Sequence, residues 1–213
     1  ETQNALAHLK AKLDYIDKNM NNPAVVSFLV NRFVTDYVSR AGIDDLPEYE
    51  AFYNAKVISP EERAKFKEIC AEWAKVKKGQ ASPAFRFADI DGKEVGLQDF
   101  AGKYVMIDVW ATWCPPCRAE APKVVQLYNE KIAKDPKVEL ILVSCDNDEE
   151  AAKKWSGQEN MPFPIIAKKD WNKIPALQKI SPPAIPTGFL LDQNGEVVEK
   201  GLPMKVYGKT GKK

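Results

Sequence analysis

The chain has 213 residues, of which 45% are hydrophobic and 29% charged, a balance typical of a globular protein with one ordinary domain or two small ones. Its 31 basic and 30 acidic residues nearly cancel, so we expect no nucleic-acid partner, because no strong positive field is available to attract one. No apolar run approaches the roughly 18 residues of a membrane-spanning helix, so we expect no membrane span.

The chain begins at Glu1 rather than with Met. It does not open with the basic and then apolar pattern of a secretory signal. We therefore expect that an upstream segment is missing from this sequence, and the lack of a signal does not decide the compartment in which the protein works.

Residues 4–76 are predicted to be helical. Apolar residues recur at helical spacing on one face in two stretches, residues 5–16 and 26–37. Pro23 separates them, because the residue before a proline avoids the α region. Ser59 fits the N-cap of a further helix, with Pro60 at its first position. The sequence therefore predicts an all-helical N-terminal extension over residues 1–79, in which no motif carries recognisable chemistry.

The polar stretch 77–83 breaks the helical pattern and marks a domain boundary, so the second domain is predicted to span residues 80–213. Two nearly continuous apolar runs, residues 104–110 and 137–144, flank a helical pattern, which is typical of parallel strands joined by a helix. Residues 187–200 read as an antiparallel hairpin around Asn194-Gly195. The predicted fold class is α/β, with a central mixed sheet flanked by helices.

A pair of cysteines lies where the strand at residues 104–110 gives way to the next helix, in the motif Cys114-Pro-Pro-Cys117. A cysteine at a helix N-terminus has a lowered thiol pKa, and the thiolate is the form that attacks a disulfide. Pro115 and Pro116 are well tolerated in a first helical turn, where their missing N–H groups would be unpaired anyway. The spacing places the two sulfurs about one turn apart, close enough to bridge.

Three uses of such a pair are open: a metal site, a structural disulfide or a redox-active dithiol. A structural zinc site needs four ligands, and the other candidates, Cys70, Cys145 and His8, are widely scattered. A disulfide across a two-residue gap closes a very small loop and adds little stability. The redox-active dithiol is therefore favoured, with no cofactor other than the Cys114–Cys117 disulfide itself. A Cys70–Cys145 bridge has no support in the sequence.

Residues 81–203 resemble the thioredoxin superfamily, and more narrowly the TlpA/ResA group of thiol-disulfide oxidoreductases, with some features of tryparedoxin. The resemblance rests on residues 109–118 around the cysteine pair, on Pro122, which matches the family's helix-kinking proline, and on Ile185-Pro186-Thr187, which matches its cis-proline loop. It implies a thioredoxin-like fold and a protein disulfide oxidoreductase. The short tail after Gly201 implies that the family's last helix is missing.

The resemblance also implies roles for individual residues. Cys114 is expected to be the nucleophile and Cys117 the resolving cysteine. Asp108 matches the buried aspartate of thioredoxin and is the favoured proton acceptor for Cys117. Glu120 matches an active-site glutamate of the ResA group and is a second candidate for moving protons. The presence of both acids departs from the ResA pattern, in which no acid is expected in the strand.

Substrate binding is expected at Trp113, Pro115 and Pro116 beside the sulfur pair, and at the backbone of residues 185–187 (Ile185, Pro186 and Thr187), where a peptide would add as a strand. The implied partners are protein thiols or disulfides and an upstream redox partner. The TlpA/ResA resemblance implies a reductant in the periplasm or cell envelope, whereas the tryparedoxin features would imply a cytoplasmic electron carrier.

Two alternatives come from other classes of protein. A peroxiredoxin-like peroxidase would need a threonine three residues before its cysteine, and this chain has Ala111 there. A non-catalytic binding module on the same scaffold would most often have lost one of the cysteines, and this chain keeps both. Neither alternative explains the sequence as well as a thiol-disulfide oxidoreductase.

Overall fold

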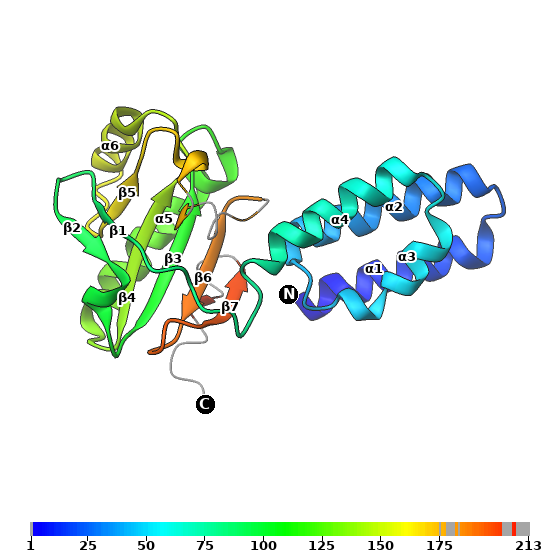
Figure 1. Ribbon diagram of the computed structural model, residues 1–213, viewed down its shortest axis with the longest axis horizontal. Helices are drawn as coiled ribbons and strands as arrows, with labels where there is room; N and C mark the ends of the chain where they lie inside the picture. Colours follow the sequence, from blue (N-terminus) through cyan, green and yellow to red (C-terminus); the bar gives the residue numbers. More distant parts are fainter. Residues whose placement is uncertain (1, 175, 178–181, 183, 202–205, 208–213) are drawn as a thin grey trace. The chain divides into compact units, whose positions relative to one another are not determined.

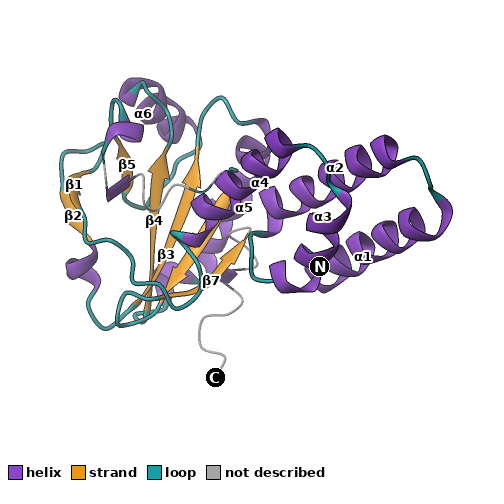
Figure 2. Cartoon of the chain, turned by 45° about the vertical axis from the view of Figure 1, so that its right-hand side comes forward, coloured by secondary structure: helices purple, strands orange, loops and turns teal. Residues whose placement is uncertain are grey.

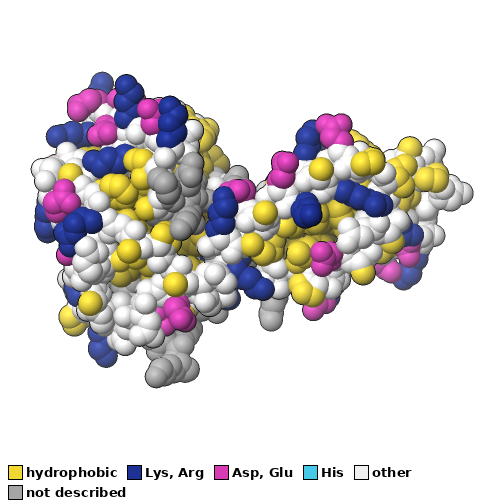
Figure 3. Space-filling model, in the orientation of Figure 1, with side chains coloured by type: hydrophobic (Ala, Val, Ile, Leu, Met, Phe, Trp, Pro, Cys, Tyr) yellow, Lys and Arg dark blue, Asp and Glu magenta, His cyan; other side chains and the backbone are white. Residues whose placement is uncertain are grey.

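The computed structural model describes residues 2–174, 176, 177, 182, 184–201, 206 and 207. The chain separates into two compact units, Glu1–Lys77 and Lys78–Lys213. None of the helices within the described residues has both the length and the apolar character that crossing a membrane requires. Figure 3 shows acidic and basic side chains interspersed on one face of the protein, rather than gathered by sign.

The N-terminal unit is built from helices (Figure 1). They are α1 (Thr2–Asn19), α2 (Pro23–Ala41), α3 (Glu50–Lys56) and α4 (Pro60–Ala74), with a 3₁₀ turn, η1 (Leu46–Glu48). Their apolar faces form a core that includes Leu13, Val34, Tyr53, Phe66 and Trp73, all buried. Asn22 caps α2, and Ser59 caps α4 by accepting a hydrogen bond from the backbone N–H of Glu62. The predicted helices are confirmed. They could be predicted because the spacing of apolar residues and the capping residue are both properties of a single helix.

The second unit is an α/β domain with a five-stranded mixed sheet in the order β5-β4-β3-β6-β7 (Figures 1 and 2). The strands are β3 (Tyr104–Trp110), β4 (Val138–Ser144), β5 (Ile165–Ala167), β6 (Thr187–Leu191) and β7 (Val197–Gly201). The central strand β3 runs parallel to β4 and antiparallel to β6. The predicted mixed sheet is confirmed, and β5 is a strand that the sequence did not reveal, because three residues are too few to show a period.

Helices flank the sheet, and a small second sheet is formed by β1 (Arg86–Ala88) and β2 (Glu94–Gly96). The longer helices are α5 (Pro115–Glu130) and α6 (Glu149–Gln158), and the 3₁₀ turns are η2 (Leu97–Phe100), η3 (Ile132–Lys134) and η4 (Trp171–Lys173). The prediction of a missing last helix falls largely on residues 202–205 and 208–213, outside the described residues. Val206 and Tyr207, which are described, are helical.

The register of the sheet brings three loops to one edge. Trp110 at the end of β3 pairs with Ser144 at the end of β4. Thr187 at the start of β6 lies opposite Val109. Because the carboxyl ends of β3 and β4 meet the amino end of β6 there, the segments that follow Trp110 and Ser144 lie beside the segment that precedes Thr187.

Candidate active site

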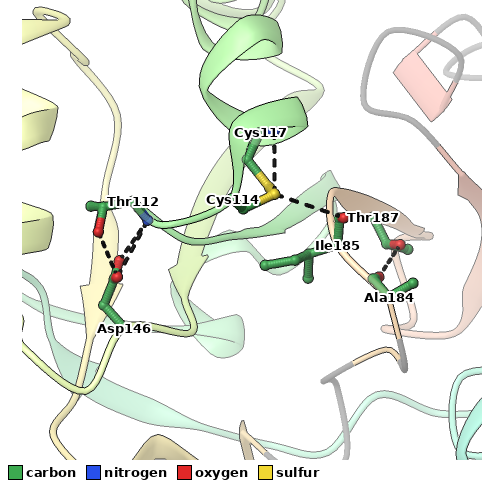
Figure 4. The surroundings of a disulfide bond; sticks show 7 residues. All are labelled: Thr112, Cys114, Cys117, Asp146, Ala184, Ile185 and Thr187. Atoms are coloured by element: carbon green, nitrogen blue, oxygen red, sulfur yellow. Dashed lines mark hydrogen bonds between the residues drawn. A yellow bond between two sulfur atoms is a disulfide. The ribbon is translucent and has the colours of Figure 1, made fainter.

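Cys114 and Cys117 form a disulfide at this edge of the sheet, with their Cα atoms 5.3 Å apart (Figure 4). Cys114 is the N-cap residue of α5, and its Sγ accepts a hydrogen bond from the backbone N–H of Cys117 at 3.3 Å. Both cysteines are buried. The first N–H groups of a helix and its dipole favour negative charge, so Cys114 holds the position in which a thiolate is stabilised.

The surface around the disulfide is formed by residues on both sides of Cys114. Pro115 and Pro116 occupy the first two positions of α5 and are exposed. Trp113 is 65% exposed, although a large aromatic side chain is usually covered. An exposed indole next to a buried disulfide is available for contact with another molecule.

The loop before β6 faces Cys114 from the other side. The Ile185–Pro186 peptide bond is cis. The carbonyl oxygen of Ile185 lies 3.8 Å from Cys114 Sγ. Thr187 is buried, and its Oγ1 donates a hydrogen bond of 2.7 Å to the carbonyl oxygen of Ala184. The structure therefore brings the residues of the expected cis-proline loop to the dithiol.

The two acidic candidates lie together behind the disulfide. Asp108, Cys117, Glu120 and Pro186 line one cavity of about 10 Å³, which is about the space that one water molecule needs. Asp108 lies within the central strand β3 and is buried, whereas Glu120 on α5 is half-buried. Asp108 Oδ1 has no hydrogen-bond partner among the residues that the structure describes. Cys117, and not Cys114, shares this cavity with both acids.

Burial, and after it the negative charge of Glu120, raises the pKa of the Asp108 carboxyl to about 8. Burial also raises the pKa of Glu120, while Lys123 lowers it by less. An acid with a pKa near that of a thiol exchanges a proton with it at little cost in free energy. Asp108 therefore has both the place and the acidity of a proton acceptor for Cys117.

Sequence reasoning missed two residues at this site, Thr112 and Asp146. The buried Asp146 carboxylate accepts hydrogen bonds from the backbone N–H and the hydroxyl of Thr112, two residues before Cys114. The sequence did carry a signal for Asp146. This residue follows a buried strand parallel to β3, and the carboxyl ends of parallel strands meet at one edge of the sheet, so Asp146 could have been placed near the cysteine pair.

The remaining cysteines, Cys70 and Cys145, take part in no disulfide. Cys145 is buried directly after β4, and its backbone N–H donates to the carbonyl oxygen of Trp110. Within the described part of the chain, no group of three or more His, Cys, Asp or Glu side chains is placed to hold a metal ion.

Comparison with known proteins places this site in a family. The model of the AhpC/TSA family matches residues 78–200. The chain belongs to the AhpC/TSA family. The match begins at the second compact unit and includes both cysteines and the loop before β6.

The chain is also similar to individual known proteins. It is 37% identical over 130 residues to the thiol-disulfide oxidoreductase ResA of Bacillus cereus, covering 61% of this chain and 72% of that protein. The ResA of Oceanobacillus iheyensis is 36% identical over 125 residues, or 57% of this chain and 62% of that protein. The predicted resemblance to the ResA group is confirmed.

The chain is also similar to solved structures of thiol-disulfide oxidoreductases. The thioredoxin domain of a thiol-disulfide oxidoreductase from Bacteroides vulgatus is 29% identical with a TM-score of 0.55, covering 62% of this chain and 94% of that one. A thiol:disulfide interchange protein from a Bacteroides species is 29% identical with a TM-score of 0.51, covering 59% and 82%. The fold is thioredoxin-like, and with its Cys114–Cys117 pair this AhpC/TSA family member is a thiol-disulfide oxidoreductase.

Proposed function

We propose that this protein reduces disulfide bonds in other proteins, with Cys114 as the nucleophile and Cys117 as the resolving cysteine. The observation that carries the proposal is the different setting of the two sulfurs. Cys114 Sγ lies at the N-terminus of α5 and 3.8 Å from the Ile185 carbonyl oxygen, whereas Cys117 lines the cavity with Asp108. The first setting stabilises a thiolate and the second offers a proton acceptor.

In the first step the Cys114 thiolate attacks one sulfur of a substrate disulfide. The substrate S–S bond breaks, a bond from Cys114 Sγ to the substrate sulfur forms, and the second substrate sulfur leaves as a thiolate that takes up a proton. The hydrogen bond from the backbone N–H of Cys117 supports the attacking sulfur. No proton has to leave Cys114 at this stage, because the thiolate is already present.

In the second step Cys117 resolves the mixed disulfide. Its thiol gives a proton to the Asp108 carboxylate, and the resulting thiolate attacks Cys114 Sγ. The substrate leaves with its second thiol, and the Cys114–Cys117 disulfide remains, so two electrons have passed to the substrate. Glu120 shares the cavity and is less buried than Asp108. An upstream dithiol partner must then supply two electrons to restore the enzyme.

The substrate is proposed to bind as an extended segment along the loop before β6. Its backbone would pair with that of residues 185–187 (Ile185, Pro186 and Thr187), as an added strand pairs with an open edge. Trp113, Pro115 and Pro116 are apolar and exposed, and they flank Cys114 in the chain. Backbone pairing recognises any extended segment, so it favours a range of protein substrates.

Replacing Trp113 with alanine is expected to weaken substrate binding without unfolding the protein. The side chain is 65% exposed, so its loss should change the free energy of unfolding by less than about 0.5 kcal/mol. An aromatic contact residue contributes about 1 kcal/mol or more to binding, which predicts an increase of about fivefold in KM for a protein disulfide. Steady-state insulin reduction and thermal unfolding check both parts, and an unchanged KM would contradict the role of Trp113.

Insulin reduction in the presence of dithiothreitol tests the proposed activity. A reductant should precipitate the insulin B chain faster than dithiothreitol alone, whereas a binding module on the same scaffold should not. The reduction potential of the Cys114–Cys117 couple then decides the direction of electron flow. A value near the roughly −270 mV of thioredoxin supports a reductant, and one near the roughly −120 mV of DsbA would contradict it.

The proposed place of work is the periplasm or cell envelope, as the resemblance to the TlpA/ResA group implies. A disulfide reductant there needs electrons from a partner that crosses the membrane or reaches through it. Fractionation of cells that express the protein from its natural gene tests the location. Recovery with cytoplasmic markers would favour the cytoplasmic electron carrier instead.

A further inference from the structure

We propose that Asp146 is a positioning residue for the dithiol, acting through Thr112 on the path of the chain into Cys114, so that it sets the balance between the dithiol and the disulfide. The inference rests on the proposed function in that it assigns Asp146 to the same reaction. Asp146 touches neither sulfur in this role and is not a catalytic residue.

The contacts of Asp146 single it out. It is the second residue after β4, and it is only 3% exposed. Its carboxylate accepts hydrogen bonds from the Thr112 hydroxyl at 2.7 Å, the Thr112 backbone N–H at 3.0 Å and the Ser144 hydroxyl at 2.7 Å. Hydrogen bonds to an ionised acceptor are about twice as strong as neutral ones. A buried carboxylate with three donors holds its partners firmly in place.

The segment that Asp146 holds lies between two regular elements. Residues 111–113 join β3 to α5 and belong to neither a strand nor a helix. Buried backbone N–H groups in such a segment need a partner other than a strand ladder. The Thr112 N–H finds it in Asp146, and the Cys114 N–H donates to the carbonyl oxygen of Ala111. Because Asp146 binds both the backbone and the side chain of Thr112, it fixes the turn that leads into Cys114.

Asp146 and the loop before β6 hold the dithiol segment from two sides, as Figure 4 shows for Asp146 and Ile185. On one side the Cys145 N–H donates to the Trp110 carbonyl oxygen at 2.8 Å, which ties the residue before Asp146 to β3. On the other side Cys114 Sγ lies 3.8 Å from the Ile185 carbonyl oxygen. A shift of Thr112 would move Cys114 Sγ relative to the N-terminus of α5, where its thiolate is stabilised.

The direction of the effect follows from this geometry. Loosening the turn weakens the stabilisation of the Cys114 thiolate, and a less stable reduced form shifts the couple toward the disulfide. The same loosening moves the pH midpoint of Cys114 alkylation upward. An Asp146 that acted on the sulfur only through its negative charge would do the reverse, because removal of the charge would favour the thiolate. Loss of Asp146 should therefore raise the alkylation midpoint of Cys114 if Asp146 acts by positioning, and lower it if Asp146 acts by its charge.

The test measures the equilibrium of the Cys114–Cys117 couple with glutathione and the pH midpoint of Cys114 alkylation. Asp146→Ala is expected to shift the equilibrium about tenfold toward the disulfide, equivalent to about 30 mV. Thr112→Val, which removes one donor and keeps the shape, should shift it about threefold in the same direction. Thr112→Ser keeps both donors, the hydroxyl and the backbone N–H, and should therefore keep the wild-type equilibrium.

Asp89→Ala is the matched control. Asp89 is also buried, and its carboxylate accepts two backbone hydrogen bonds of 2.9 Å, but it lies at the turn of the small β1–β2 sheet. The Asp89→Ala variant should have lower thermal stability and an unchanged equilibrium of the Cys114–Cys117 couple with glutathione. The inference is overturned if Asp146→Ala and Thr112→Val match this control, or if the alkylation midpoint of Asp146→Ala moves downward.

The test of Asp146 does not depend on a single variant or on a protein substrate. If Asp146→Ala does not fold, Thr112→Val against Thr112→Ser carries the test alone. Both readouts concern the sulfur pair itself and need no protein substrate. A wild-type protein that fails to reduce insulin would therefore overturn the proposed function, while the glutathione equilibrium would still decide the role of Asp146.

Discussion

Replacing Cys117 with serine is expected to abolish turnover and to trap a mixed disulfide between Cys114 and the substrate. The hydroxyl of serine does not attack a disulfide at neutral pH, so the second step cannot occur, whereas the Cys114 thiolate still performs the first. Incubation of reduced Cys117→Ser with a disulfide-bonded protein, followed by non-reducing electrophoresis and mass measurement, should show an adduct that dithiothreitol removes.

Cys114→Ser is the matched control for the trap, because it leaves Cys117 as the sole member of the pair. Cys117 lines the cavity with Asp108 and is not the N-cap residue of α5, so this variant should form an adduct far more slowly than Cys117→Ser. Equal rates of adduct formation, or an adduct that peptide mapping places on another cysteine, would reverse or remove the assigned roles.

Replacing Asp108 with asparagine is expected to slow the resolution of the mixed disulfide. General base catalysis contributes about a hundredfold or more, so a loss of that order at pH 7 follows if Asp108 accepts the Cys117 proton. A base works in its ionised form, so the wild-type rate should rise with pH and level off near the Asp108 pKa of about 8. In Asp108→Asn the rise should follow the ionisation of Cys117 alone. Rapid-quench kinetics of a single turnover measure this step.

The same variant should change how stability depends on pH. Asp108 has a pKa of about 8 in the folded protein against an ordinary value of 3.8, so between these values the folded state binds more protons than the unfolded state. The free energy of unfolding of the wild-type protein should therefore fall as pH rises from 4 to 8 and level off above, by about 1.4 kcal/mol for each unit of pKa shift.

Asp108→Asn removes this contribution, so it should match the wild type near pH 4 and exceed it in stability at pH 8. Urea unfolding across this range measures the difference. Glu120→Gln is the control, since its carboxyl is only half-buried and the charge of Lys123 opposes the rise in its pKa that burial causes. Parallel stability curves for Asp108→Asn and the wild type would show that Asp108 titrates normally and would remove it as the proton acceptor.

Much of the fold could be predicted from the sequence, because periodicity and caps are local properties. The strand at residues 104–110 was predicted with the bounds of β3, and Ser59 was predicted as the cap that it is. The cysteine pair at the strand–helix junction and the separate Ile185-Pro186-Thr187 motif indicated the thioredoxin-like class, which the comparisons confirm. Short β5 was missed, since three residues carry little pattern.

For the candidate active site, too, local features could be predicted and long-range contacts could not. The sequence by itself determined that a reactive cysteine pair lies at the start of a helix, because residue type, spacing and the end of an apolar run specify that placement. Only the tertiary structure decided that Cys117 rather than Cys114 shares a cavity with Asp108 and Glu120, and that Asp146 holds Thr112. These contacts depend on the register of β3 against β4 and β6 and on how α5 packs on the sheet, and long-range packing leaves no periodic signal along the chain.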